Sequence, residues 1–264
     1  MRLARAAALI LCAALGACAS TSPEPASFTR ADVVRGFELV AFGREFANRD
    51  VDHVIKFDHP VQVHVVHEPL DLRPVDGTRR VLDVIEGFHA HPTFERLTHA
   101  AIDEDQTELI DRADILVFAV GTDAYEYFHE RASKRWIEDG RLAVSDHFYF
   151  NRCGANIADR DGRIHRAVVF LDVDEMSPEL DECLTEEILQ SLGLPDDDDS
   201  LPWSMFNDSN DVSRPGPYDN MLVSVLYSDR LTPGMSRREA MRLAPSIVEQ
   251  LWPSHERAMA RAAE

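Results

Sequence analysis

The hydrophobic and polar positions along the chain switch between helical and strand spacing, which predicts a mixed α+β fold. Thr29 and Asp32 have the spacing of a capping box, and the apolar positions that follow predict a helix from there to about Asn48. Farther along, runs of β-branched residues alternate with segments whose apolar residues recur every three or four positions. These patterns predict strands at 61–66 and 115–120 and helices at 79–91 and 123–136.

A second group of elements is predicted after residue 140. The segments 148–150 and 167–171 are expected to pair as antiparallel strands across the turn-rich segment 158–163. A capping box at Ser236 begins a C-terminal amphipathic helix, which Pro245 is expected to interrupt. The sequence therefore predicts a sheet that leads into a helix, followed by a mainly helical C-terminal part.

The helix between these two regions is the most informative segment of the chain. Residues 179–192 have helical spacing, and Gly193 follows as a natural stop. One arc of this helix is apolar and the opposite arc is polar, a pattern that a solvent-exposed polar face would explain. The apolar arc holds Leu184, Ile188, Leu189 and Leu192, and the polar arc holds Cys183, Glu186, Glu187 and Gln190.

The N-terminus has the pattern of an export signal. Arg2 and Arg5 precede an apolar run at 6–15 that is too short to span a bilayer permanently. The run ends in Leu-Gly-Ala-Cys at 15–18, which resembles the lipobox of bacterial lipoproteins, where the cysteine is acylated. An ordinary signal peptide with an incidental Cys18 is the alternative. The expected division is a signal peptide at 1–17, a lipidated cysteine and tether at 18–28, and a domain at 29–264.

The charge balance excludes one class of partner. The chain has 27 basic and 47 acidic residues, and removal of residues 1–17 removes two arginines, so the net charge of −20 becomes −22. Such a surface repels nucleic acid, and we expect no nucleic-acid partner. Lipid on Cys18 would instead attach the domain to a membrane, and Ala19 in place of aspartate points by analogy to the periplasmic side of the outer membrane.

The cysteines indicate a disulfide. Cys12 lies in the signal and Cys18 is the expected lipid acceptor, which leaves Cys153 and Cys183 in an oxidising compartment. A bond between them would close a loop of about thirty residues and stabilise the fold by roughly 3 to 4 kcal/mol. Two free thiols or a metal-binding pair are the alternatives.

The spacing from 186 to 196, E-E-x-x-Q-x-x-G-x-x-D, resembles the metzincin zinc-peptidase motif H-E-x-x-H-x-x-G-x-x-H/D. In that motif two ligands one helical turn apart share a face, a glycine turns the chain, and a third ligand returns to the metal. Here Glu186 and Gln190 stand at the two histidine positions. Glu187 stands at the general base, Gly193 at the turn glycine and Asp196 at the third ligand.

This set of candidate ligands offers oxygen atoms only. Zinc prefers imidazole and thiolate ligands, whereas Glu186, Gln190 and Asp196 would suit a harder divalent metal such as calcium, magnesium or manganese. Tight zinc binding is therefore not expected. Glu187 could still act as general base on a water held by such a metal.

The segment 183–196, with Ser204–Asp208 and Leu231–Met235, also resembles an uncharacterised domain family of Gram-negative lipoproteins. That resemblance implies a zincin-like fold, in which a helix and sheet lead into the motif helix and a smaller helical part follows. Three functions remain open. The first is a degenerate zincin-like domain in a binding or envelope role, with an unidentified protein or peptide partner. The second is an atypical metal-dependent hydrolase that uses Glu187 as general base. The third is a purely structural lipoprotein.

Overall fold

The fold is taken from a computed structural model of the chain. It describes residues 28–43, 51–68, 93–101, 107–125, 153–174, 180–210, 212 and 214–262. The predicted helix at 79–91 and strand at 148–150 lie outside these ranges, as does Cys18. Of the predicted helix at 123–136, only the first turn, at 122–125, is described.

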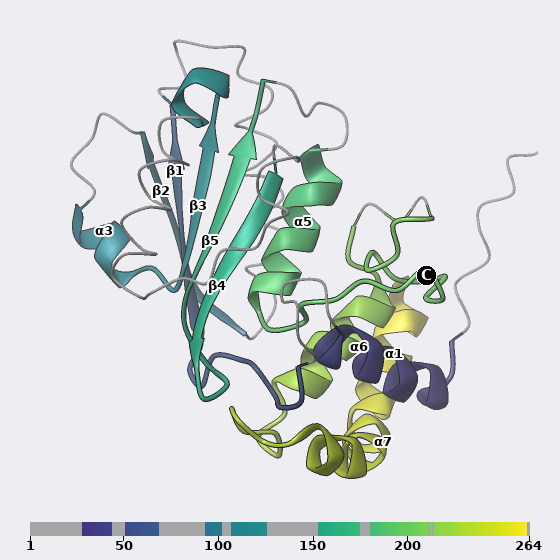
Figure 1. Cartoon of the computed structure of the whole chain (residues 1–264). Coiled ribbons are helices and arrows are strands. Elements are labelled where there is room, and N and C mark those ends of the chain that lie inside the picture. Colours follow the sequence, from purple (N-terminus) through teal and green to yellow (C-terminus); the bar gives the residue numbers. More distant parts are fainter. Residues whose placement is uncertain are drawn as a thin grey trace, which may run out of the picture.

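A five-stranded mixed sheet forms the first layer, in the order β2-β1-β3-β5-β4 (Figure 1). Strand β1 pairs in parallel with β2 and β3, and β3 pairs in parallel with β5. The edge strand β4 is antiparallel to β5. The bounds are β1 Val61–His67, β2 Phe94–Ala101, β3 Ile115–Val120, β4 Cys153–Arg160 and β5 Arg163–Asp172. The predicted α+β class with a mixed sheet is confirmed.

The antiparallel pair differs from the expected one. The partner of β5 is β4, and the turn between them consists of Asp161 and Gly162 alone, whereas the whole segment 158–163 was predicted to be a turn. Both turn residues have positive φ, 54° and 79°. Aspartate followed by glycine favours this tight hairpin, so strand pairing continues up to the two turn residues.

Strand β2 and the short helix α3, Thr107–Arg112, were not predicted. Strand β2 lies at the edge of the sheet, and Glu95, Arg96 and His99 within it are exposed. An edge strand needs few apolar side chains, and its polar residues hide the alternation that marks a half-buried strand.

Three helices pack together beside the sheet: α1 Arg30–Phe42, α6 Pro217–Leu226 and α7 Arg237–Ala262 (Figure 1). The capping box that begins α1 is confirmed, because Thr29 N–H donates to Asp32 Oδ2 at 2.8 Å and Asp32 N–H donates to Thr29 Oγ1 at 3.2 Å. Helix α1 ends at Phe42, earlier than the predicted end near Asn48.

Helix α7 is not interrupted at Pro245, contrary to expectation, and it also continues through Pro253. A proline removes one backbone donor from a helix, which costs about 3 kcal/mol. In α7 this loss is offset because a stripe of side chains is buried in the core on both sides of Pro245. That stripe is Ala240, Ala244, Ile247 and Val248.

One apolar core joins the two layers. It contains inward-facing residues of the sheet together with residues of α1, α5 (Leu180–Ser191), α6 and α7. Phe28 also belongs to this core and is 8% exposed. No helix in the described part of the chain is both long and apolar enough to cross a membrane.

Candidate functional site

Helix α5 carries the predicted motif and packs against β4 and β5 (Figure 1). The buried side chains of Leu184, Ile188 and Leu192 join the core, as the helical spacing predicted. The opposite arc is not a solvent-exposed face, because Gln190 is only 1% exposed and Glu186 is largely covered. The side chains of Glu186 and Gln190 are therefore partly shielded from water. Such burial costs free energy unless the polar atoms have hydrogen-bond partners.

The helix ends where Gly193 adopts a φ of 107°, the left-handed conformation that glycine tolerates. Gly193 also lies so close to the carbonyl oxygen of Ile55 that a Cβ atom would clash with it. The chain turns sharply here and brings Asp197 back beside α5. Gly193 thus follows the end of α5, as the helical spacing predicted.

The centre of the site is the Gln190 side chain. Its Nε2 donates to Glu186 Oε1 at 3.3 Å and to Asp197 Oδ2 at 3.3 Å. Carboxylate oxygens of Glu186, Asp197 and Asp208 all lie within 4.8 Å of one another. We call these four residues the α5 acidic cluster.

The predicted third ligand, Asp196, lies elsewhere. Its backbone N–H donates to Val40 O at 3.2 Å, and its carboxylate lies directly against Gly43 at the end of α1. Asp197 occupies the place beside Glu186 and Gln190 that the motif assigned to Asp196. The structure therefore brings together two of the three predicted metal-binding residues and adds Asp197 and Asp208.

Crowding of carboxylates changes their protonation. Burial raises the pKa of Glu186 well above its ordinary value, and the negative charges of Asp197, Glu187 and Asp208 raise it further. The pKa of Asp208 is raised by burial and by Asp197 and Asp199. Glu186 is thus held as a neutral acid at neutral pH unless a cation approaches.

The candidate general base, Glu187, lies apart from this cluster. One of its carboxylate oxygens falls within 4.8 Å of the sulfur atoms of Cys153 and Cys183. Its Oε2 is buried and has no hydrogen-bond partner, and burial raises the pKa of this carboxyl to about 8 despite an opposing hydrogen bond from the backbone of Ala155. Glu187 is therefore a largely protonated acid at pH 7.

The predicted disulfide between Cys153 and Cys183 is present in the structure. It joins the first residue of β4 to the first turn of α5, with Cα atoms 6.4 Å apart. Since both sulfur atoms are used in this bond, they are not metal ligands. The α5 acidic cluster contains neither cysteine, and its carboxylate oxygens suit calcium, magnesium or manganese better than zinc.

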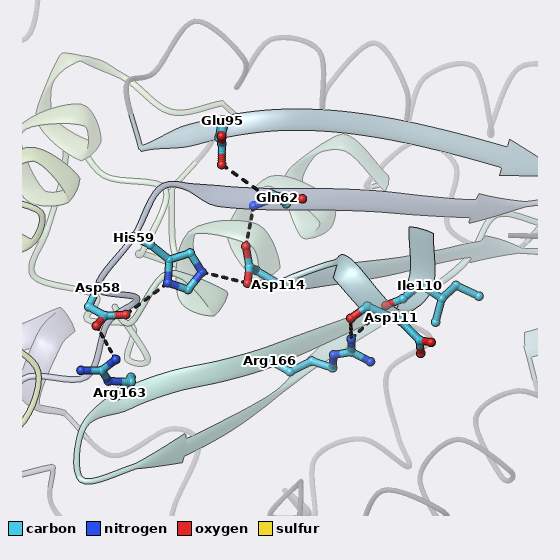
Figure 2. A network of polar contacts seen from close by, with 9 residues as sticks. All are labelled: Asp58, His59, Gln62, Glu95, Ile110, Asp111, Asp114, Arg163 and Arg166. Carbon is cyan, nitrogen blue, oxygen red and sulfur yellow. Dashed lines mark hydrogen bonds and ion pairs between the residues drawn. The ribbon is translucent and has the colours of Figure 1, made fainter. Parts of the chain in front are cut away.

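A second network of polar residues, which was not predicted from the sequence, lies at the amino ends of the parallel strands β1 and β3 (Figure 2). His59 bridges Asp58 and Asp114, with its Nδ1 3.1 Å from Asp58 Oδ1 and its Nε2 2.9 Å from Asp114 Oδ1. Asp114 also accepts the Gln62 N–H at 2.8 Å. Burial alone would lower the pKa of His59, but the hydrogen bonds to Asp114 and Asp58 raise it. No local pattern in the sequence links Asp58 and His59, which precede β1, to Asp114, which directly precedes β3.

A cleft of about 830 Å³ adjoins this group, between the amino end of the sheet and helices α6 and α7. Lys56 lines it, and burial lowers the pKa of this lysine to about 8. The Lys56 ammonium donates to Leu226 O at 2.8 Å and to Leu231 O at 3.2 Å, and it lies 4.8 Å from the centre of the Tyr227 ring. Because these contacts fix the ammonium at the end of α6, Lys56 has a structural role.

Comparison with known proteins gives one match. Residues 30–246 match the family model described as Protein of unknown function (DUF2927), in agreement with the expected resemblance to an uncharacterised domain family. No curated protein and no solved structure matches the chain.

Proposed function

Since the chain belongs to the family described as Protein of unknown function (DUF2927), we propose that it is an envelope lipoprotein with a degenerate, non-catalytic zincin-like domain. The domain serves a binding role in the periplasm, with a protein or peptide as partner and no nucleic acid. It is anchored through lipid on Cys18, most simply to the outer membrane.

The observation that carries the non-catalytic part is the position of the Gln190 amide. Its N–H groups bind Glu186 and Asp197, so a donor points to the place where a metal ligand would have to offer a lone pair. Within the cluster this amide donates hydrogen bonds to two carboxyl groups, and a proton on Glu186 removes one negative charge. Without zinc, no bound water has its pKa lowered to about 7, and peptidase chemistry has no hydroxide to use.

The zincin-like part of the proposal is supported by the order of the elements. Helix α1 and the sheet precede α5, and a smaller helical part follows, as the motif resemblance implies. The glycine turn at Gly193 brings a carboxylate back beside residues 186 and 190, although the residue is Asp197 instead of Asp196.

Restoring the two imidazoles tests this proposal. The double variant Glu186→His with Gln190→His should gain one zinc site that the parent lacks, measured by isothermal titration of zinc. Adding Asp197→Asn should weaken the new site, whereas adding Asp196→Asn should not, because Asp196 lies against Gly43. Zinc binding by the parent that Glu186→Gln removes would contradict the proposal.

The alternative function is an atypical metal-dependent hydrolase with Glu187 as general base. It is favoured by the buried Glu187 Oε2, which has no hydrogen-bond partner and belongs to a carboxyl whose pKa is about 8. Hydrolysis of a generic peptide substrate in calcium or manganese, abolished by Glu187→Ala and kept by Glu182→Ala on the same helix, would replace the non-catalytic proposal with this one.

The lipid anchor is tested separately. Changing Cys18 to serine should abolish incorporation of a radioactive fatty acid, because a hydroxyl does not replace the thiol as acceptor. Cys12→Ser, within the expected signal, is the matched control and should leave labelling unchanged. Equal labelling of Cys18→Ser and the parent would remove the lipoprotein proposal and leave the proposal for the domain untouched.

A further inference from the structure

Two histidines meet near the carboxyl ends of strands β1 and β2. His67 is the last residue of β1, and its register partner on β2 is Ala101. His99 lies two residues before Ala101, and side chains two residues apart on a strand point to the same face of the sheet. The histidines therefore share a face at the edge where open α/β sheets commonly bind ligands.

The two rings approach each other closely. His67 Nε2 lies 3.2 Å from His99 Nδ1, and the ring centroids are 5.4 Å apart. His67 is 4% exposed, whereas His99 on the edge strand is open to solvent. One imidazole is thus held rigidly in the sheet, and the other can adjust its angle.

The backbone fixes the tautomer of His67. Its Nδ1 lies 2.7 Å from the carbonyl oxygen of Glu68, which only accepts hydrogen bonds, so Nδ1 carries the proton. The neutral ring therefore has its lone pair on Nε2, the atom that faces His99. A histidine that ligates a metal typically donates its other N–H to a carbonyl or carboxylate in this way.

We propose that His67 and His99 form a two-histidine site for a divalent transition metal ion such as zinc, nickel or copper. Two nitrogen ligands at about 2.0 to 2.1 Å from a tetrahedral metal lie roughly 3.3 to 3.4 Å apart, close to the distance found here. Imidazole suits these ions, in contrast to the oxygen donors of the α5 acidic cluster. The remaining coordination positions are open to water or to a ligand atom of a partner.

Metal binding replaces the contact between the rings. In the metal-free state His99 Nδ1–H donates to the lone pair of His67 Nε2. On binding, His99 moves its proton to Nε2, and both facing nitrogens then offer lone pairs to the ion.

The test is isothermal titration of the full chain with zinc chloride. The parent should bind one ion at this site, and His99→Ala should weaken that binding at least about tenfold. His165→Ala is the matched control, since His165 is an exposed histidine on β5, and it should bind zinc as the parent does.

A second variant separates the metal site from a simple hydrogen bond. His99→Gln keeps an N–H that can donate to His67 but removes the imidazole, so it should retain the thermal stability of the parent and lose zinc binding. Equal zinc affinity of His99→Gln, His99→Ala and the parent would overturn the proposal. Loss of binding in Glu186→Gln with no loss in His99→Ala would also overturn it, because the ion would then lie in the α5 acidic cluster.

Discussion

The free energy of unfolding is expected to fall as the pH rises from 5 to 8, opposite to the usual effect of salt-bridged carboxylates. In the unfolded chain the carboxyls of Glu186 and Glu187 lose their protons near the ordinary pKa of 4.5. In the folded chain both pKa values are raised, that of Glu187 to about 8. Between these values the folded state binds more protons than the unfolded state, so stability is present at low pH and is lost as the pH rises.

The size of this effect is large enough to measure. For each carboxyl that stays protonated in the folded state, the free energy of unfolding falls by roughly 1.4 kcal/mol per unit rise in pH. This slope applies between the pKa of the group in the unfolded chain and its pKa in the folded chain. Asp219, whose pKa burial raises to about 6, adds to the slope below that pH. The proper measurement is chemical denaturation at several values between pH 5 and pH 8.

A double variant identifies the groups responsible. Glu186→Gln with Glu187→Gln should flatten the slope above pH 6, because neither amide titrates. Glu182→Gln, on the same helix but outside the α5 acidic cluster, is the control and should keep the slope of the parent. An unchanged slope in the double variant would show that the two glutamates do not hold protons in the folded state.

Loss of the disulfide is the second change with a large expected effect. Cys153 and Cys183 are 30 positions apart, and closing a loop of that length stabilises a fold by roughly 3 to 4 kcal/mol in the chain-entropy model. Cys153→Ala with Cys183→Ala should lower the free energy of unfolding by about this amount and the melting temperature by roughly 10 °C.

Reductant provides the control for the disulfide. The parent with reductant should approach the stability of the double alanine variant, whereas reductant should not change the double variant itself. Alkylation of both cysteines in the unreduced parent, seen by mass spectrometry, would contradict the bond.

The sequence predicted those elements whose own residues carry the signal. The capping box at Thr29 and the β-branched runs of β1 and β3 each contain their pattern within a few residues. Strand β2 and the uninterrupted α7 depend on packing against other parts of the chain. Local spacing does not contain that information, because tertiary contacts override propensity at both places.

The candidate site could be predicted only in part, for the same reason. Glu186 and Gln190 share a helical face by spacing alone, so their meeting followed from the sequence. Which aspartate returns to them depends on α1, since the Asp196 backbone bonds Val40 and its side chain lies against Gly43. The meeting of His67 with His99 likewise required the pairing of β1 with an unpredicted strand.

The burial of Phe28 sets how the domain would stand at a membrane. The centroid of its ring lies 5.0 Å from that of Tyr218 on α6 and 5.9 Å from that of Trp252 on α7. A force applied to the chain before Phe28 would therefore act first on these two helices. Cys18 is ten residues before Phe28, and ten extended residues reach at most about 36 Å. A lipid on Cys18 would therefore hold the helical end within that reach of a membrane, while β1 and β2, which carry His67 and His99 near their carboxyl ends, point away from α6 and α7 (Figure 1).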